Sequence, residues 1–169
     1  MAAVGFEQEL RSILKGARKT VVMAVGDELD PRDCLGHLAG RRVSALNLKG
    51  VEVLLTSQMP ENFTSVVRRM KPSHVILVDA AEMGKSPGEV AIIDSGKISA
   101  TRVSTHAMPL SVLMEYLKKE LKVKVALIGI QPASSEEFSE VIQPPEVIEG
   151  IERIAGGIKA AVGDRKRRV

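Results

Sequence analysis

Residues 21–36 have the sequence VVMAVGDELDPRDCLG, in which a short apolar run meets a turn rich in acids. The run from Val21 to Val25 has the length and the branched side chains of a buried parallel strand, and Gly26 ends it. After Asp33 the pattern becomes helical. In open α/β sheets, ligands bind beyond the carboxyl ends of the strands, which is where this turn is expected to lie. Acids are also common in solvated turns, so this stretch alone is compatible with a site or with an ordinary surface turn.

The rest of the chain alternates strand and helix patterns around this stretch. Strands are predicted over residues 19–26, 51–56, 74–79 and 123–130, with an edge hairpin made by 89–93 and 98–103. Helices are predicted over residues 6–16, 33–46, about 61–70 and 109–121, and from 144 or 145 onward. This alternation predicts an α/β fold: a three-layer α/β/α sandwich with a twisted, mostly parallel sheet of about five strands.

The 169 residues suffice for one domain with a full core. We expect a single domain over residues 1–163 and a basic, disordered tail over residues 164–169. The tail supplies most of the positive charge behind the formal net charge of +3. The nearly neutral body and the scarcity of aromatic residues argue against nucleic-acid binding.

Cellular location is predicted from the apolar runs and the cysteine content. No apolar run reaches the roughly 18 residues of a membrane span, and the N-terminus lacks a signal-peptide pattern. The single cysteine, Cys34, fits a reducing compartment. We therefore expect a cytoplasmic monomer that is not inserted in a membrane.

Three side chains that could bind a metal lie just after strands or before a helix. Asp33 follows the first predicted strand, Asp79 ends the most apolar one, and His106 precedes the helix that begins at Pro109. Two carboxylates and one imidazole suit a borderline divalent ion such as nickel or zinc, with positions left for water or substrate. Each residue alone also has an ordinary explanation, as a surface histidine or a capping acid.

Five local motifs, in chain order, resemble those of the nickel-iron hydrogenase maturation endopeptidases. They are GDEL with Asp33 and Leu35-Gly36 (26–36), MPEN (59–62), VDAAEMG with PGE (78–89), STHAMPL (104–110) and GIQP (129–132). The MPEN and GIQP motifs indicate the branch that serves formate-hydrogenlyase-type and membrane-bound hydrogenases.

The resemblance implies an endopeptidase that removes the C-terminal extension of a hydrogenase large-subunit precursor after nickel insertion. It implies that Asp33, Asp79 and His106 bind the nickel that the precursor already carries. Nickel is then supplied by the substrate, no resident cofactor is expected, and the precursor is the partner. Asp33 and Asp79 are also the candidate catalytic residues of an aspartic or metal-dependent peptidase, although the residue that activates the attacking water is not visible in the sequence.

The chain departs from the family pattern at a few positions near the first motif. Asp27 stands where the family generally has asparagine, and Arg32 stands where it has an acid. Arg32 could pair with Asp33 and lower its pKa, or it could point to solvent. Cys34 and His37 occupy places where small residues or proline are usual.

Three other hypotheses compete with a metal-dependent peptidase. A thiol near a helix N-terminus ionises more easily, so Cys34 could be a nucleophile with His106 and Asp79. The second is a nucleotide-binding or phospho-receiver domain. The acids after two strands suit a receiver, but GIQP stands where a receiver needs a lysine, and the sequence has no glycine-rich phosphate loop. The third alternative is a non-catalytic module that binds nickel or the precursor, which the sequence does not separate from a peptidase.

Overall fold

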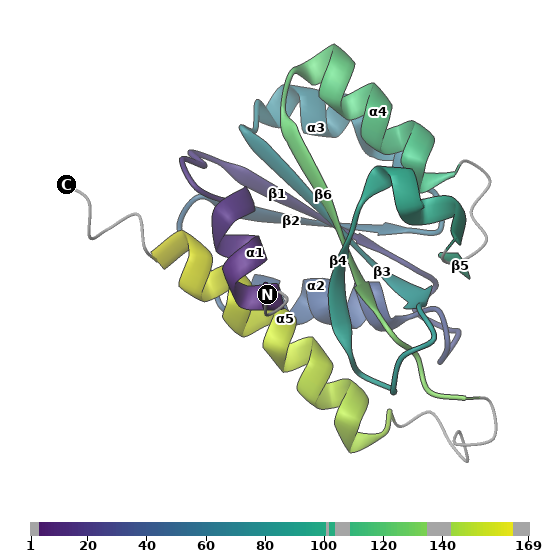
Figure 1. Cartoon of the computed structure of the whole chain (residues 1–169). Helices are drawn as coiled ribbons and strands as arrows, with labels where there is room; N and C mark the ends of the chain where they lie inside the picture. The colour runs from purple at the N-terminus through teal and green to yellow at the C-terminus, as the bar shows by residue number, and fades with distance from the viewer. Residues whose placement is uncertain (1–3, 101, 104–108, 135–142, 164–169) are drawn as a thin grey trace.

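The computed structural model describes residues 4–100, 102–103, 109–134 and 143–163, and it contains one central sheet. The strands are β1 (Thr20–Val25), β2 (Val51–Ser57), β3 (His74–Glu82), β4 (Val90–Ile93), β5 (Arg102–Val103) and β6 (Lys124–Ile130). Their order is β2-β1-β3-β6-β4, and β5 pairs with β3 (Figure 1). Strands β1, β2, β3 and β6 are parallel, whereas β4 and β5 run antiparallel to their partners.

Helices cover both faces of the sheet. One face carries α1 (Phe6–Ile13), α2 (Leu35–Ala45) and α5 (Pro145–Gly163), and the other carries α3 (Thr64–Met70) and α4 (Leu110–Leu121) (Figure 1). Short 3₁₀ helices, η1 (Pro60–Phe63) and η2 (Ser95–Ala100), precede α3 and follow β4. The predicted three-layer α/β/α sandwich with a mostly parallel sheet is confirmed.

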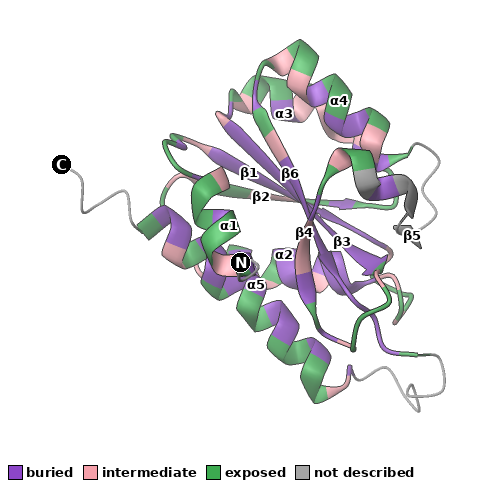
Figure 2. Cartoon of the chain, viewed as in Figure 1, coloured by how far each residue is buried: buried purple, intermediate pink, exposed green. Residues whose placement is uncertain are grey.

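The two layers of the core follow from side-chain alternation along the central strands. In β3, Ile76 and Val78 pack with the cluster under α1, α2 and α5, whereas Val75 and Leu77 pack with the cluster under α3 and α4. A strand covered on both faces needs apolar residues at every position, which explains the unbroken apolar runs of β1 and β3. Figure 2 shows these strands coloured as buried along most of their length.

Two predictions about strands are wrong. Strand β3 does not end at Asp79 but continues to Glu82, because the following residues still pair with neighbours: Ala80 with Ile130 of β6, and Ala81 with Val103 of β5. The predicted edge hairpin does not form either. Strand β4 pairs with β6, the chain then turns through η2, and β5 pairs with β3.

The smaller deviations lie at the helix ends. Helix α2 begins at Leu35 rather than at Asp33, and the MPEN motif contributes to a 3₁₀ turn before α3.

Residues 164–169 lie outside the described residues, so the basic tail stays a prediction. Among the described helices, none combines the length and the apolar character that crossing a membrane requires.

Candidate active site

The carboxyl ends of β1 and β3 form the boundary at which the first two predicted site residues lie. The chain that leaves β1 runs through α2 to β2 on one side, whereas the chain that leaves β3 runs to β4 and, through α4, to β6 on the other side. The crossovers thus diverge at this boundary, which is where open α/β sheets bind ligands. Gly36 of α2 lies so close to it that an added Cβ would overlap with the carbonyl oxygens of Val25 and Val78.

Asp33 is held at this boundary by the turn between β1 and α2. Gly26 has a φ of 134°, and a Cβ there would overlap with the carbonyl oxygen of Asp33, so this close approach requires glycine. The carboxylate Oδ2 of Asp33 accepts the backbone N–H of Asp27 at 3.0 Å. Its Oδ1 is buried and has no hydrogen-bond partner among the described residues. Asp33 therefore has a buried oxygen available for a ligand.

Asp79 lies within β3 and is fully buried, opposite Gly129 of β6. Its Oδ1 accepts the backbone N–H of Ala80 at 2.9 Å. By strand alternation its side chain shares a face with Leu77 and Ala81, which belong to the apolar cluster under α3 and α4. A carboxyl group in such a layer costs free energy unless polar contacts compensate its burial.

The structure brings Asp33 and Asp79 to the same boundary. Gly36, three positions after Asp33 in the chain, lies against the carbonyl of Val78, the residue before Asp79. His106 lies outside the described residues. Within the parts of the chain that are described, no three His, Cys, Asp or Glu side chains gather closely enough to hold a metal ion. The nickel-binding trio and the catalytic roles of Asp33 and Asp79 therefore stay predictions.

The departures from the family motif take defined positions in the turn. Arg32 is exposed, and its backbone N–H donates to Oδ1 of Asp30 at 2.9 Å. Among the described interactions it makes no ion pair with Asp33. Asp27 accepts the N–H of Leu29 at 2.9 Å through Oδ1 and the side-chain amide of Gln58 at 2.7 Å through Oδ2. Asp27 therefore connects two loops at this edge of the sheet.

Cys34 has the surroundings of a structural thiol. Its side chain is buried, and its Sγ lies 3.5 Å from the amide nitrogen of Gln143, which also donates to the carbonyl of Pro31 at 2.7 Å. Burial raises the pKa of the Cys34 thiol. A nucleophilic cysteine needs a lowered pKa and access to substrate, so these surroundings argue against the Cys34 hypothesis.

Gln131, which belongs to the GIQP motif, has a structural role that the sequence did not predict. Its buried Oε1 accepts the backbone N–H groups of Met83 at 2.7 Å and Lys85 at 3.3 Å, and its Nε2 donates to Glu82 at 2.8 Å. The loop after β3 is thus fixed to the end of β6. The same residue stands where a receiver domain would need a lysine, which disfavours that hypothesis.

The loop after β3 is also fixed to the last helix. Gly88 has a φ of 84°, and a Cβ there would overlap with the backbone of Glu146 at the start of α5. A Cβ on Gly150 of α5 would in turn overlap with the carbonyl of Gly88. The two backbones therefore touch, and glycine at both positions makes this contact possible.

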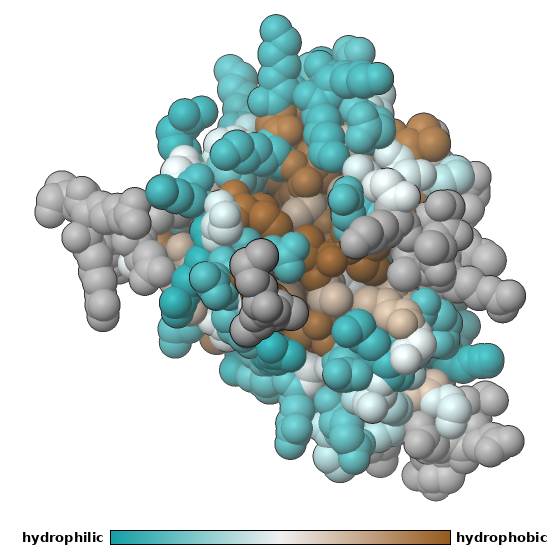
Figure 3. Space-filling model, viewed as in Figure 1, coloured by the Kyte–Doolittle hydropathy of each residue, from teal (hydrophilic) through white to brown (hydrophobic). Residues whose placement is uncertain are grey.

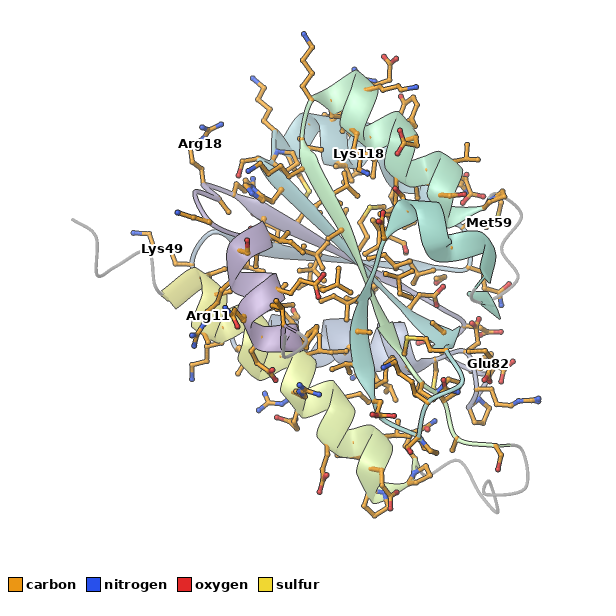
Figure 4. The ribbon with its side chains drawn as sticks, in the orientation of Figure 1. Arg11, Arg18, Lys49, Met59, Glu82 and Lys118 are labelled. Atoms are coloured by element: carbon orange, nitrogen blue, oxygen red, sulfur yellow. The ribbon has the colours of Figure 1, made fainter. Side chains whose placement is uncertain are left out.

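Two cavities differ in their relation to the candidate site. A pocket of about 380 Å³ lies beside the turn that holds Asp33, lined by Asp27, Thr56, Ser57, Gln58, Met59, Asn62 and Phe63. Figure 4 shows Met59 and Glu82 on the same side of the molecule, opposite Arg18 and Lys49, which precede β1 and β2. A larger cavity of about 510 Å³ runs along β4 between α1 and α4, where Figure 3 shows apolar surface, and neither Asp33 nor Asp79 lines it.

Hydrogenase maturation proteases match this chain in sequence and in fold. A family model for hydrogenase maturation proteases matches residues 43–160. A putative hydrogenase maturation protease of Methanocaldococcus jannaschii is 34% identical over 127 residues, covering 70% of this chain and 75% of the relative. The hydrogenase 3 maturation protease of Escherichia coli K12 is 32% identical over 125 residues, covering 73% of this chain and 80% of the relative.

The same similarity holds for solved structures. The crystal structure of the NiFe hydrogenase maturation protease HycI from Thermococcus kodakarensis superposes with a TM-score of 0.79 at 30% identity. The alignment covers 92% of this chain and 99% of that one. The arrangement of strands and helices described above is therefore shared over nearly the whole length of that protein.

Proposed function

This chain belongs to the hydrogenase maturation protease family, and on that premise we propose that it is an endopeptidase for a nickel-iron hydrogenase large-subunit precursor. The enzyme removes the C-terminal extension of the precursor after nickel has been inserted. The similarity to a hydrogenase 3 maturation protease over most of the chain supports this assignment. The precursor is the protein partner.

Nickel in this proposal is carried by the substrate. Asp33, Asp79 and His106 bind the ion that the precursor presents, and the ion places the scissile bond at the carboxyl boundary of β1 and β3. Two carboxylates and one imidazole form a modest nickel site, whereas the cysteine thiolates of the precursor supply stronger ligands. The free enzyme is therefore expected to hold little metal of its own.

The observation that carries the proposal is the state of the two carboxylates. Asp33 Oδ1 is buried without a described partner, and Asp79 is a fully buried carboxyl group at the same boundary. Carboxylates of this kind can bind a metal ion, and they can accept a proton from water. In the cleavage step, the water oxygen bonds to the scissile carbonyl carbon, one carboxylate takes the proton, and that proton leaves with the amine of the extension.

Incubation with a nickel-loaded precursor tests this function directly. The mass of the precursor should fall by that of its C-terminal extension, and a metal-free precursor that cannot load nickel should stay intact. Equal cleavage of the metal-free precursor would contradict the role of nickel and favour an ordinary peptidase. Binding of the nickel-loaded precursor without any cleavage would favour the non-catalytic module.

The variant His106→Ala tests the third member of the trio. It should abolish processing of the nickel-loaded precursor, since the imidazole is the nitrogen ligand of the predicted set. Elemental analysis of the purified wild-type enzyme completes the test, because a resident catalytic ion would appear at one equivalent per chain. A stoichiometric ion in the free enzyme would contradict the proposal that nickel arrives with the substrate.

A further inference from the structure

Asp27 makes hydrogen bonds within the turn of Asp33, where its carbonyl also accepts the N–H of Asp30 at 3.2 Å, and one bond to the neighbouring loop. Its backbone N–H donates to Asp33 Oδ2 at 3.0 Å, and its Oδ1 accepts the N–H of Leu29 at 2.9 Å. Its Oδ2 accepts the side-chain amide of Gln58 at 2.7 Å. The orientation of the residue 27 peptide is thus linked through two side chains to the loop after β2.

The backbone bond to Asp33 decides which carboxylate oxygen remains available. Because Oδ2 is occupied by the Asp27 N–H, Oδ1 is the buried oxygen without a described partner. A rotation of the residue 27 peptide would release Oδ2 and allow the carboxylate to turn. The backbone of Asp33 is held separately, since its N–H donates to the Asp30 carbonyl at 3.0 Å, but the orientation of its carboxylate depends on the peptide of Asp27.

Gln58 connects this arrangement to the 380 Å³ pocket beside the site. Asp27 and Gln58 both line the pocket, and they come from different loops, 31 positions apart in sequence. A hydrogen bond with a carboxylate acceptor is shorter and stronger than one between neutral groups. This surface bond therefore adds a side-chain link at the wall of the pocket to the backbone bond that already joins the two loops, from the Gly26 N–H to the Ser57 carbonyl at 2.8 Å.

We propose that Asp27 is a positioning residue for the Asp33 carboxylate, held in place by its hydrogen bond to Gln58. The effect of this bond on processing rests on the proposed function, whereas its effect on the geometry of residue 27 does not. Asparagine, which the resembled family generally has at this position, retains the acceptor for the Leu29 N–H. It can also bond to residue 58 if the amide of Gln58 turns round.

Reversing the polarity of the bond tests the proposal. In Gln58→Glu, a second carboxylate faces Asp27 Oδ2, so the two groups repel each other and the peptide of residue 27 is displaced. In Asp27→Asn combined with Gln58→Glu, the new amide at position 27 donates to the new carboxylate at position 58, and the net charge equals that of the wild type. The variant Gln8→Glu adds the same charge at an exposed position on α1 and serves as the control.

The first measurement is independent of catalysis. The amide proton of residue 27 is hydrogen-bonded to a carboxylate, so its resonance in a ¹⁵N–¹H spectrum should move upfield in Gln58→Glu and return in the double variant. Its hydrogen exchange should rise and fall in parallel. An unchanged resonance in Gln58→Glu would overturn the proposal, whether or not the wild-type protein cleaves the precursor.

The second measurement is steady-state processing of the nickel-loaded precursor. We expect Gln58→Glu to lower kcat about tenfold and the double variant to regain it within about twofold, as for a coupled pair. Gln8→Glu should leave both kcat and KM unchanged. A resonance that is restored without recovery of kcat, or a change confined to KM, would overturn the positioning role. Absence of cleavage by the wild type would instead refute the proposed function.

Discussion

The two ends of the parallel sheet use polar side chains in opposite ways. At the amino ends of β1 and β3, Ser73 Oγ accepts the N–H of Arg18 at 2.8 Å and that of Lys19 at 3.2 Å, and it donates to the Lys19 carbonyl at 3.1 Å. At the carboxyl ends, Asp33 keeps a buried oxygen without a described partner, and Asp79 places a carboxyl group in an apolar layer. The contrast rests on Ser73 and Asp33: the Ser73 hydroxyl both accepts and donates within the fold, whereas one buried oxygen of Asp33 has no described partner.

The largest effect on activity is expected from Asp79→Asn. The amide oxygen still accepts the Ala80 N–H, so the fold is retained, but the residue loses its charge and its ability to accept a proton. Processing should fall by about 10²–10⁴-fold, the range for removal of a general acid or base. The thermal unfolding midpoint should stay close to that of the wild type, because the bond to the Ala80 N–H is kept. Processing at the wild-type rate by this variant would show that Asp79 has no catalytic role at the carboxyl end of the sheet.

The largest effect on stability is expected from Gly36→Ala. The new methyl group would overlap with the carbonyl oxygens of Val25 and Val78, so α2 would have to lift from the sheet. Overpacking of this kind should lower the free energy of unfolding by about 3 kcal/mol, measured by chemical denaturation. The control is Gly156→Ala in α5, where an added Cβ meets nothing within 4 Å. That variant should instead raise stability by about 1 kcal/mol.

A smaller effect, on stability alone, is expected from Ser73→Ala at the opposite end of the sheet. The change removes the acceptor of the Arg18 N–H and the donor to the Lys19 carbonyl. The free energy of unfolding should fall by about 1–3 kcal/mol, while processing per folded molecule should not change. Ser65→Ala on the exposed side of α3 is the matched control. A loss of activity in folded Ser73→Ala would show that the two ends are not separate in function.

The smallest effect is expected from Cys34→Ala. The thiol is buried with a raised pKa, so it has no part in the proposed chemistry, and processing should stay within about twofold of the wild type. Alkylation of the native protein by iodoacetamide should also be slow, and it should become fast on unfolding. Complete loss of processing by a folded variant would revive the hypothesis that Cys34 is a nucleophile.

The sequence predicted the fold and the location of the acidic turn because both depend on local patterns. The apolar runs of residues 21–25 and 75–78 have the composition of strands covered on both faces, and the structure confirms them as parts of β1 and β3. Gly26 and Gly36 bracket the acids, and both glycines make backbone contacts that a Cβ would prevent. The resemblance of the motifs then indicated the family, which the comparisons confirm.

The remaining features depend on contacts between residues far apart in the chain. Asp79 looked like the end of a strand, because its pairing with Gly129 is set by β6, which comes about 50 residues later in sequence. The partners of β4 and β5 were mistaken for the same reason, since neighbouring segments chose other strands. The bond between Asp27 and Gln58 spans 31 positions, and that between Met83 and Gln131 spans 48. No local pattern indicates such bonds.

The contact between Gly88 and α5 has a consequence for biosynthesis. Among the described elements, α5 is the last to leave the ribosome, and it supplies a large share of one core cluster, including Val147, Ile151, Ile154 and Ile158. Until it emerges, the loop after β3 lacks the backbone against which Gly88 packs, and α1 and α2 cover their face of the sheet only in part. Domains generally complete folding as units, so a nascent or truncated chain without α5 lacks part of the core that packs on this face of the sheet. Folding of this core is thus completed only once the segment that forms α5 has been synthesised.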